Sequence, residues 1–162
     1  MMTEVDRTDR QILALLSKNV RMTNKELAHV VGLSASSVHE RVKKLNESGL
    51  IEGAHLNVDL ARMGLALKAL LFVQLSEHEK TNLTRFMRDL LEISEVRAAW
   101  MITGRFDAVV EIATRDTAHL HAVVVEKFSS RKEIHRIETS IIFEGARQND
   151  LSSALEAATQ GR

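Results

Sequence analysis

Three cations lie on one predicted helix, and the segment that forms this helix starts with a serine. Arg41, Lys43 and Lys44 belong to the segment SASSVHERVKKLNE, which starts at Ser34. Serine is a favoured residue at a helix start, where small polar side chains can approach DNA base edges while cations further along reach phosphates. Most charge runs are instead an ordinary solvated helix face. The elements around this helix distinguish the two interpretations.

The segment before these cations has the pattern of a helix-turn-helix. Thr23 and Glu26 form a T-x-x-E capping box, and Gly32 follows where a left-handed helix end costs least. Ser34 then caps the next helix, so two short helices flank a tight turn. This combination favours duplex DNA binding over the solvated-face alternative. The expected DNA-contacting residues are Thr23, Asn24, Ser34, Ser36, Ser37, His39, Glu40, Arg41, Lys43 and Lys44.

A turn in the second half of the chain has ligand-binding chemistry. It runs from Thr103 through Gly104 and Arg105 to Asp107. Glycine lets backbone N–H groups face outward, as a carboxylate ligand requires, and an aspartate can accept from an ammonium group. The alternative is an ordinary hairpin turn, because Gly and Asp are common in turns.

Strands and helices alternate around this turn. The pattern predicts a ferredoxin-like βαββαβ unit, with both helices on one face of an antiparallel sheet. The other face is open, and Trp100 in the middle of the sheet indicates that a partner covers it. The predicted strands are Ala69–Leu75, Val96–Ile102, Ala108–Ala113 and Ile137–Phe143, and the predicted helices are Lys80–Leu91 and a segment from Asp116 or Thr117 to Phe128. Alternation along the second strand predicts that Val96, Ala98, Trp100 and Ile102 share one face.

The sequence divides into four parts. Residues 1–50 contain the helix-turn-helix, and residues 51–67 form a hinge strand, Ile51–Val58, with a linker. Residues 68–144 form the βαββαβ unit. Residues 145–162 are a small, polar tail in which Leu151, Ala154 and Leu155 are compatible with a short helix.

Composition excludes several classes of function. The 162-residue chain has no cysteine, which removes disulfide frameworks, thiolate zinc sites and cysteine nucleophiles. Its net charge is zero and its aromatic content is 4%, so neither a wholly basic coat nor stacking platforms for single strands are expected. His119 and His121 diverge on a helix, so no metal site is expected. The polar N-terminus and the short apolar runs favour a cytoplasmic protein without a membrane span.

Two alternatives to a DNA-binding protein stay open at this point. The chain contains no G-x-S-x-G, P-loop or GxGxxG motif, so an enzyme would need a site in the open sheet face or at Gly104. An assembly module would use the helix-turn-helix to contact protein. Salt-dependent binding to duplex DNA would separate such an assembly module from a DNA-binding protein.

Two motifs in order resemble one family. The segment DRTDRQILALLSKNVRMTNKELAHVVGLSASSVHERVKKLNESGLI resembles the N-terminal pattern of the Lrp/AsnC, or leucine-responsive regulator, family of prokaryotic transcription factors. The loop with Thr103, Gly104, Phe106 and Asp107 matches that family's T-G-x-[YF]-D. Ala35 departs from a frequent proline, and the segment SSRKE at 129–133 departs from a usual Pro-Gly-Val turn.

The resemblance implies an α+β protein, with a winged-type helix-turn-helix joined by a strand hinge to a ligand-sensing ferredoxin-like domain. It implies a transcriptional regulator whose assembly or DNA affinity responds to a small effector, typically an amino acid, without cofactor or catalysis. It also implies a homo-oligomer, a dimer through the sheet faces and often a tetramer of dimers. The implied effector residues are Met101, Ile102, Thr103, Gly104, Arg105, Asp107, Thr139 and Ser140.

Overall fold

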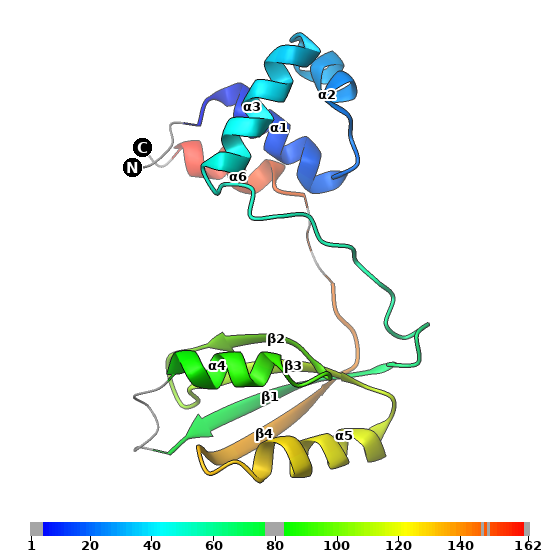
Figure 1. Cartoon of the computed structure of the whole chain (residues 1–162), viewed down its shortest axis with the longest axis vertical. Coiled ribbons are helices and arrows are strands. Elements are labelled where there is room, and N and C mark those ends of the chain that lie inside the picture. The colour runs from blue at the N-terminus through cyan, green and yellow to red at the C-terminus, as the bar shows by residue number, and fades with distance from the viewer. Residues whose placement is uncertain (1–4, 77–82, 147, 149, 161–162) are drawn as a thin grey trace. The chain divides into compact units, whose positions relative to one another are not determined.

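The chain forms two compact units in a computed structural model that describes residues 5–76, 83–146, 148 and 150–160 (Figure 1). One unit joins the residues up to Leu56 with those from Ala146 onward, and the other is Asn57–Gly145. The C-terminal segment, predicted from the sequence to be a tail, therefore belongs to the helical unit.

The helical unit is built from α1 (Arg7–Lys18), α2 (Asn24–Val31) and α3 (Ala35–Glu47). Each helix has a side-chain N-cap, supplied by Asp6, Thr23 and Ser34 respectively. Gly32 ends α2 at φ 71°, a left-handed conformation that suits glycine. One small core holds the three helices together and contains Ile12, Leu27, Ala28, Val38 and Leu45. The predicted helix-turn-helix is confirmed.

A further helix, α6 (Ser152–Gln160), packs against α1. Two polar contacts hold the beginning of this segment. Lys18 Nζ lies 3.0 Å from Asp150 Oδ2, and the Leu151 backbone N–H donates to Ser17 Oγ at 3.3 Å. The hydroxyl and backbone N–H of Ser152 lower the pKa of Asp150 to about 2, with help from Lys18.

The second unit is a four-stranded antiparallel sheet in the order β2-β3-β1-β4. Its core joins alternate β1 residues to helical residues such as Phe86, Leu90 and Phe128. The opposite face of β1, which includes Leu70 and Phe72, is only half-buried. The predicted βαββαβ order is confirmed. Its elements are β1 (Leu67–Leu75), α4 (Leu83–Leu91), β2 (Val96–Met101), β3 (Ala108–Thr114), α5 (Thr117–Val123), the π-helix η2 (Val124–Ser129) and β4 (Ile134–Ile142).

The second strand does not alternate as the sequence predicts. Val96 pairs with Ile112 and is buried, whereas Ala98 pairs with Glu111 and Trp100 with Val109. The register shift between Val96 and Ala98 is a bulge, which moves Trp100 to the face opposite Val96. Trp100 is 47% exposed. The prediction that Val96 and Trp100 share a face was therefore wrong, but Trp100 does lie on the open face.

The predicted hinge strand over Ile51–Val58 forms no ladder with any other described residue. A strand needs a neighbour for its backbone hydrogen bonds, and a single chain offers none here. The segment also leaves large apolar side chains in solvent: Leu56 is 78% exposed and Val58 is 47% exposed.

Candidate DNA-binding and effector sites

The start of α3 carries a cluster of three serine hydroxyls. Ser34 Oγ accepts from the Ser37 backbone N–H at 3.1 Å, as an N-cap does. It also lies 3.0 Å from Ser36 Oγ and 2.8 Å from Ser37 Oγ. All three residues are exposed. Hydroxyls both donate and accept, so this end of α3 can adapt to either base edges or phosphate oxygens.

Thr23, the N-cap of α2, and Asn24, its first residue, were also predicted to contact DNA. The Asn24 side-chain amide nitrogen lies 3.2 Å from His39 Nδ1, which links the start of α2 to α3. With the amide as donor, His39 carries its proton on Nε2 and presents a donor there. Thr23 is occupied by its capping box, because its hydroxyl and backbone N–H both donate to Glu26. The Thr23 backbone N–H, followed by the hydroxyl, lowers the pKa of Glu26.

Arg41 is held by two carboxylates of the α1 N-terminus. Its Nη1 lies 2.6 Å from Asp6 Oδ2 and 2.8 Å from Asp9 Oδ1. Hydrogen bonds to Asp9 and then Asp6 raise the pKa of Arg41. The Asp9 backbone N–H, and then Arg41, lower the pKa of Asp6. Arg41 therefore ties α3 to α1, and its phosphate contact stays a prediction.

The two lysines of α3 are more available. Lys43 Nζ lies 4.0 Å from Glu47, a distance at the limit of an ion pair. Lys44 is exposed, and no ion pair to it occurs among the described residues. Exposed Glu40 shares this helix. Asp6 and Asp9 were not predicted as partners of Arg41, although their D-x-x-D spacing is visible in the sequence.

The predicted effector turn is tied to the end of β1. Asp107 Oδ2 accepts from the Leu75 backbone N–H at 2.8 Å, and the Asp107 backbone N–H donates to Val73 at 2.9 Å. The Ile102 N–H donates to the Asp107 carbonyl oxygen at 3.0 Å, which closes the turn. Asp107 therefore has a structural task in addition to any ligand contact. Gly104 is exposed at φ 117°, with no atom within 4 Å of where a Cβ would stand.

Arg105 lies against the open face of the sheet. Its Nη2 lies 2.9 Å from Glu138 Oε1, and Arg136 also pairs with Glu138 at 2.9 Å. The Arg105 guanidinium lies 5.2 Å from the Phe106 ring centroid, and that ring is 5.6 Å from Phe72. Glu138 and Phe72 are neighbours across the β1–β4 ladder. Glu138 was not predicted from the sequence, because its position beside Phe72 depends on the register of β1 and β4.

The remaining predicted effector residues are divided by the register. Val73 pairs with both Ala108 and Ile137, so the turn is level with Ile137 on β4. Thr139 and Ser140 lie two and three residues further along, about 7–10 Å at the usual rise of a strand. Met101 and Ile102 adjoin the turn, and each is 37% exposed. Within one chain, then, Thr103 and its neighbours form one group, and Thr139 and Ser140 a second.

Comparison with known proteins assigns both units. Residues 5–52 match the family model described as winged helix-turn-helix DNA-binding, and residues 68–151 match the one described as Lrp/AsnC ligand binding domain. The chain belongs to the Lrp/AsnC family. It is 33% identical over 144 residues to the transcriptional regulator AldR of Mycobacterium tuberculosis, which covers 89% of this chain and 80% of AldR.

Two solved structures show that the same fold occurs in other regulatory proteins. The structure of E. coli AsnC matches with a TM-score of 0.80 and 27% identity, over 90% of this chain and 97% of AsnC. A transcriptional regulator from Neisseria meningitidis, solved as a complex with L-Met, has the same fold, with a TM-score of 0.83 and 24% identity over 90% and 94% of the chains.

The family assignment confirms the main sequence predictions. The protein is an α+β transcriptional regulator with a helix-turn-helix DNA-binding domain and a ligand-binding domain. The relatives that it matches are transcriptional regulators. Across the described ranges, no helix is long and apolar enough to cross a membrane.

Proposed function

We propose that α3 reads operator DNA through its exposed serines, His39 and Lys44, while Arg41 positions the helix. The observation that carries this is the contrast among the cations of α3. Arg41 is engaged by Asp6 and Asp9, whereas Lys44 is exposed. Exposed cations beside a polar helix start suit phosphate contacts that orient base-reading side chains. Thr23, Asn24, Glu40 and Lys43 flank this surface.

Salt-dependent binding to duplex DNA tests this proposal. Each phosphate contact adds about 0.9 to the slope of log affinity against log salt. Lys44→Ala should lower the slope by about one and weaken binding to operator and random duplex alike. Ser37→Ala should instead reduce the preference for operator, with the slope unchanged. Unchanged affinity and slope for Lys44→Ala would contradict the assignment of α3 to the groove.

The ligand of the second unit, we propose, is a free amino acid held beside the Thr103–Asp107 turn. The Neisseria regulator that shares this fold was solved with L-Met. In this chain, Gly104 leaves backbone groups open to a carboxylate, and Met101 and Ile102 offer apolar contact. Thr139 and Ser140 complete the site from a second subunit, since the register keeps them from the turn within one chain.

Two glycine variants test the turn. Gly104→Ala and Gly64→Ala both place a Cβ at positive φ, 117° and 86°, with no neighbouring atom within 4 Å. Both substitutions introduce backbone strain, but only Gly104 lies in the proposed site. In a thermal-shift screen of the twenty amino acids, Gly104→Ala should lose the shift that Gly64→Ala keeps. Equal shifts in both variants would place the amino acid elsewhere.

A homo-oligomer, at least a dimer, accounts for the open sheet face. Trp100 and Phe72 lie on that face, and the unpaired segment around Leu56 leaves further apolar surface in solvent. Apolar patches of this kind mark interaction surfaces, and a two-fold dimer presents two recognition helices about 34 Å apart. Assembly to a tetramer of dimers extends the same proposal. Light scattering that found a monomer at micromolar concentration would contradict it.

We also propose that the protein is not an enzyme and works in the cytoplasm. Its relatives are regulators, and a regulator of this class acts where the chromosome is. Among the described residues, no group of three or more His, Cys, Asp or Glu is placed to hold a metal ion. The proposed chemistry is reversible binding of DNA and a ligand, which requires no cofactor.

A further inference from the structure

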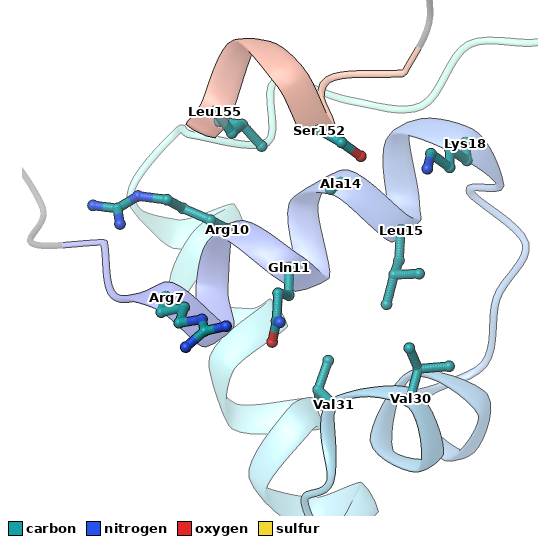
Figure 2. Close-up of a pocket in the computed structure, with 10 residues that line it drawn as sticks. All are labelled: Arg7, Arg10, Gln11, Ala14, Leu15, Lys18, Val30, Val31, Ser152 and Leu155. Carbon is teal, nitrogen blue, oxygen red and sulfur yellow. The ribbon is translucent and has the colours of Figure 1, made fainter. Parts of the chain in front are cut away.

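The helical unit contains a cavity away from the α3 surface (Figure 2). It has a volume of about 730 Å³ and lies along α1, with α2 on one side and α6 on the other. Cavities of this size accommodate small organic ligands. The lining residues are Arg7, Arg10, Gln11, Ala14, Leu15, Lys18, Val30, Val31, Ser152 and Leu155.

The lining combines positive charge with an apolar wall. It includes three cations, Arg7, Arg10 and Lys18, and no carboxylate. Leu15 of α1 and Val30 of α2 extend toward one another in Figure 2. Val30 is 58% exposed, so the wall is open to solvent. The whole chain has zero net charge, so these three cations are a local concentration of positive charge.

The cations differ in their partners. Lys18 is paired with Asp150 at 3.0 Å. The ion pairs found among the described residues include neither Arg7 nor Arg10. Both arginines come from the first turn of α1, so their guanidinium groups are available at one end of the cavity, beyond the apolar wall. Guanidinium groups bind carboxylates and phosphates through paired N–H donors.

The outer wall is supplied by α6. Ser152 and Leu155 face the cavity from this helix, which the Lys18–Asp150 and Ser17–Leu151 contacts hold on α1. A molecule in the cavity would touch both α1 and α6 and would therefore favour the docked position of α6. Ligand binding in the cavity is thus coupled to the position of α6 on α1, within the unit that also contains α3.

We propose that this cavity binds an amphipathic organic anion, with the anionic head on Arg7 and Arg10 and the apolar body against Leu15, Val30 and Leu155. The site is separate from the Thr103–Asp107 turn and does not depend on the amino-acid proposal. A zwitterionic amino acid fits it poorly, because the lining has no carboxylate for an ammonium group. Ligand binding here stabilises the α1–α6 contact.

The full-length protein can be tested with 8-anilinonaphthalene-1-sulfonate, which combines an anionic head with an aromatic body and fluoresces when desolvated. Fluorescence titrations would compare the wild type with the double variant Arg7→Gln/Arg10→Gln and with Val30→Trp, which places a bulky ring on the apolar wall of the cavity. Arg88→Gln, an exposed arginine of α4, is the matched charge control. Decanoate and decyltrimethylammonium would then compete with the probe.

We expect at least about tenfold weaker binding for the double arginine variant and for Val30→Trp, and wild-type affinity for Arg88→Gln. Decanoate should displace the probe, and decyltrimethylammonium should not. Wild-type affinity in both cavity variants would overturn the proposal, and so would equal competition by the two detergents. If the double variant lost DNA affinity and salt slope while probe binding stayed the same, Arg7 and Arg10 would be phosphate contacts and the proposal would again fail.

Discussion

Replacing Arg41 with glutamine separates a positioning residue from a DNA contact. Arg41 bridges α3 to the α1 N-terminus through Asp6 and Asp9, at 2.6 and 2.8 Å. Lys44, three residues further along the helix, is exposed to solvent. We expect Arg41→Gln to reduce the stability of the helical unit and Lys44→Ala to reduce the salt dependence of DNA binding.

The size of the Arg41 effect follows from its surroundings. Hydrogen bonds to charged groups contribute about 1.5–3 kcal/mol when protected, and exposed ion pairs contribute about 0–1 kcal/mol. The Asp9 side chain is 14% exposed, Arg41 is 32% and Asp6 is 49%, so the pair lies between these limits. A loss of about 1–2 kcal/mol is expected, and each kcal/mol lowers the Tm of a domain of this size by about 4–8 °C.

Urea unfolding of wild type, Arg41→Gln, Asp9→Asn and the double variant measures the coupling. The cycle should give an interaction free energy of about 1 kcal/mol between Arg41 and Asp9. The pKa of Asp6 is lowered in the folded protein, so its contribution is present above the unfolded pKa and is lost as pH falls through the folded value. The difference between wild type and Arg41→Gln should therefore shrink below about pH 4.

DNA titrations over a salt series complete the comparison. Arg41→Gln should keep the wild-type salt slope, while Lys44→Ala should lose about one unit of it with stability within about 0.5 kcal/mol of wild type. The reverse result, an unchanged Tm and a slope reduced by one for Arg41→Gln, would refute the positioning role and place the Arg41 guanidinium on a phosphate.

Three further outcomes are expected. Leu71→Ala, at a fully buried position of β1, should lower the free energy of unfolding by about 2–5 kcal/mol in urea titrations. Trp100 is the only tryptophan, so its emission should shift to longer wavelength on dilution if the sheet face is an interface. Asp150 has a pKa lowered to about 2, so its stabilising contribution at the start of α6 is present above about pH 4 and is lost as pH falls toward 2. As pH falls, the Leu151 amide should then lose protection from hydrogen exchange before the sheet amides do. In Asp150→Asn, the protection of the Leu151 amide should not change over this pH range.

Much of the fold could be predicted because local signals agree with the tertiary structure. The capping box at Thr23 and the serine cap at Ser34 form as their spacing predicts. The βαββαβ order along the chain followed from the alternation of strands and helices. The bulge after Val96 could not be predicted, because an extra residue in one strand is set by pairing with β3 and leaves no mark on composition.

The candidate sites were harder to predict, since their residues are brought together from distant parts of the chain. Arg41 meets Asp6 across 35 residues, and Arg105 meets Glu138 across 33. The α1–α6 contact joins Ser17 to Leu151 across 134 residues. Arg41 and Arg105 were predicted from the sequence as functional cations, but their carboxylate partners were not. The segment that forms α6 was predicted as a polar tail compatible with a short helix.

The position of the effector turn has a consequence for how a ligand could control assembly. Arg105 reaches from this turn to Glu138, and Phe106 packs on Phe72, both on the open face proposed as the dimer interface. A ligand carboxylate beside Gly104 would compete with Glu138 for Arg105, because both are anions for one guanidinium. Binding would then leave Glu138 paired with Arg136 alone on the interface and change the free energy of subunit association. By linkage, association would change ligand affinity by the same factor. Glu138→Gln, which weakens that competition, should therefore tighten amino-acid binding and reduce the effect of the ligand on assembly in sedimentation experiments. Equal coupling in this variant and the wild type would show that Glu138 does not couple the turn to the interface.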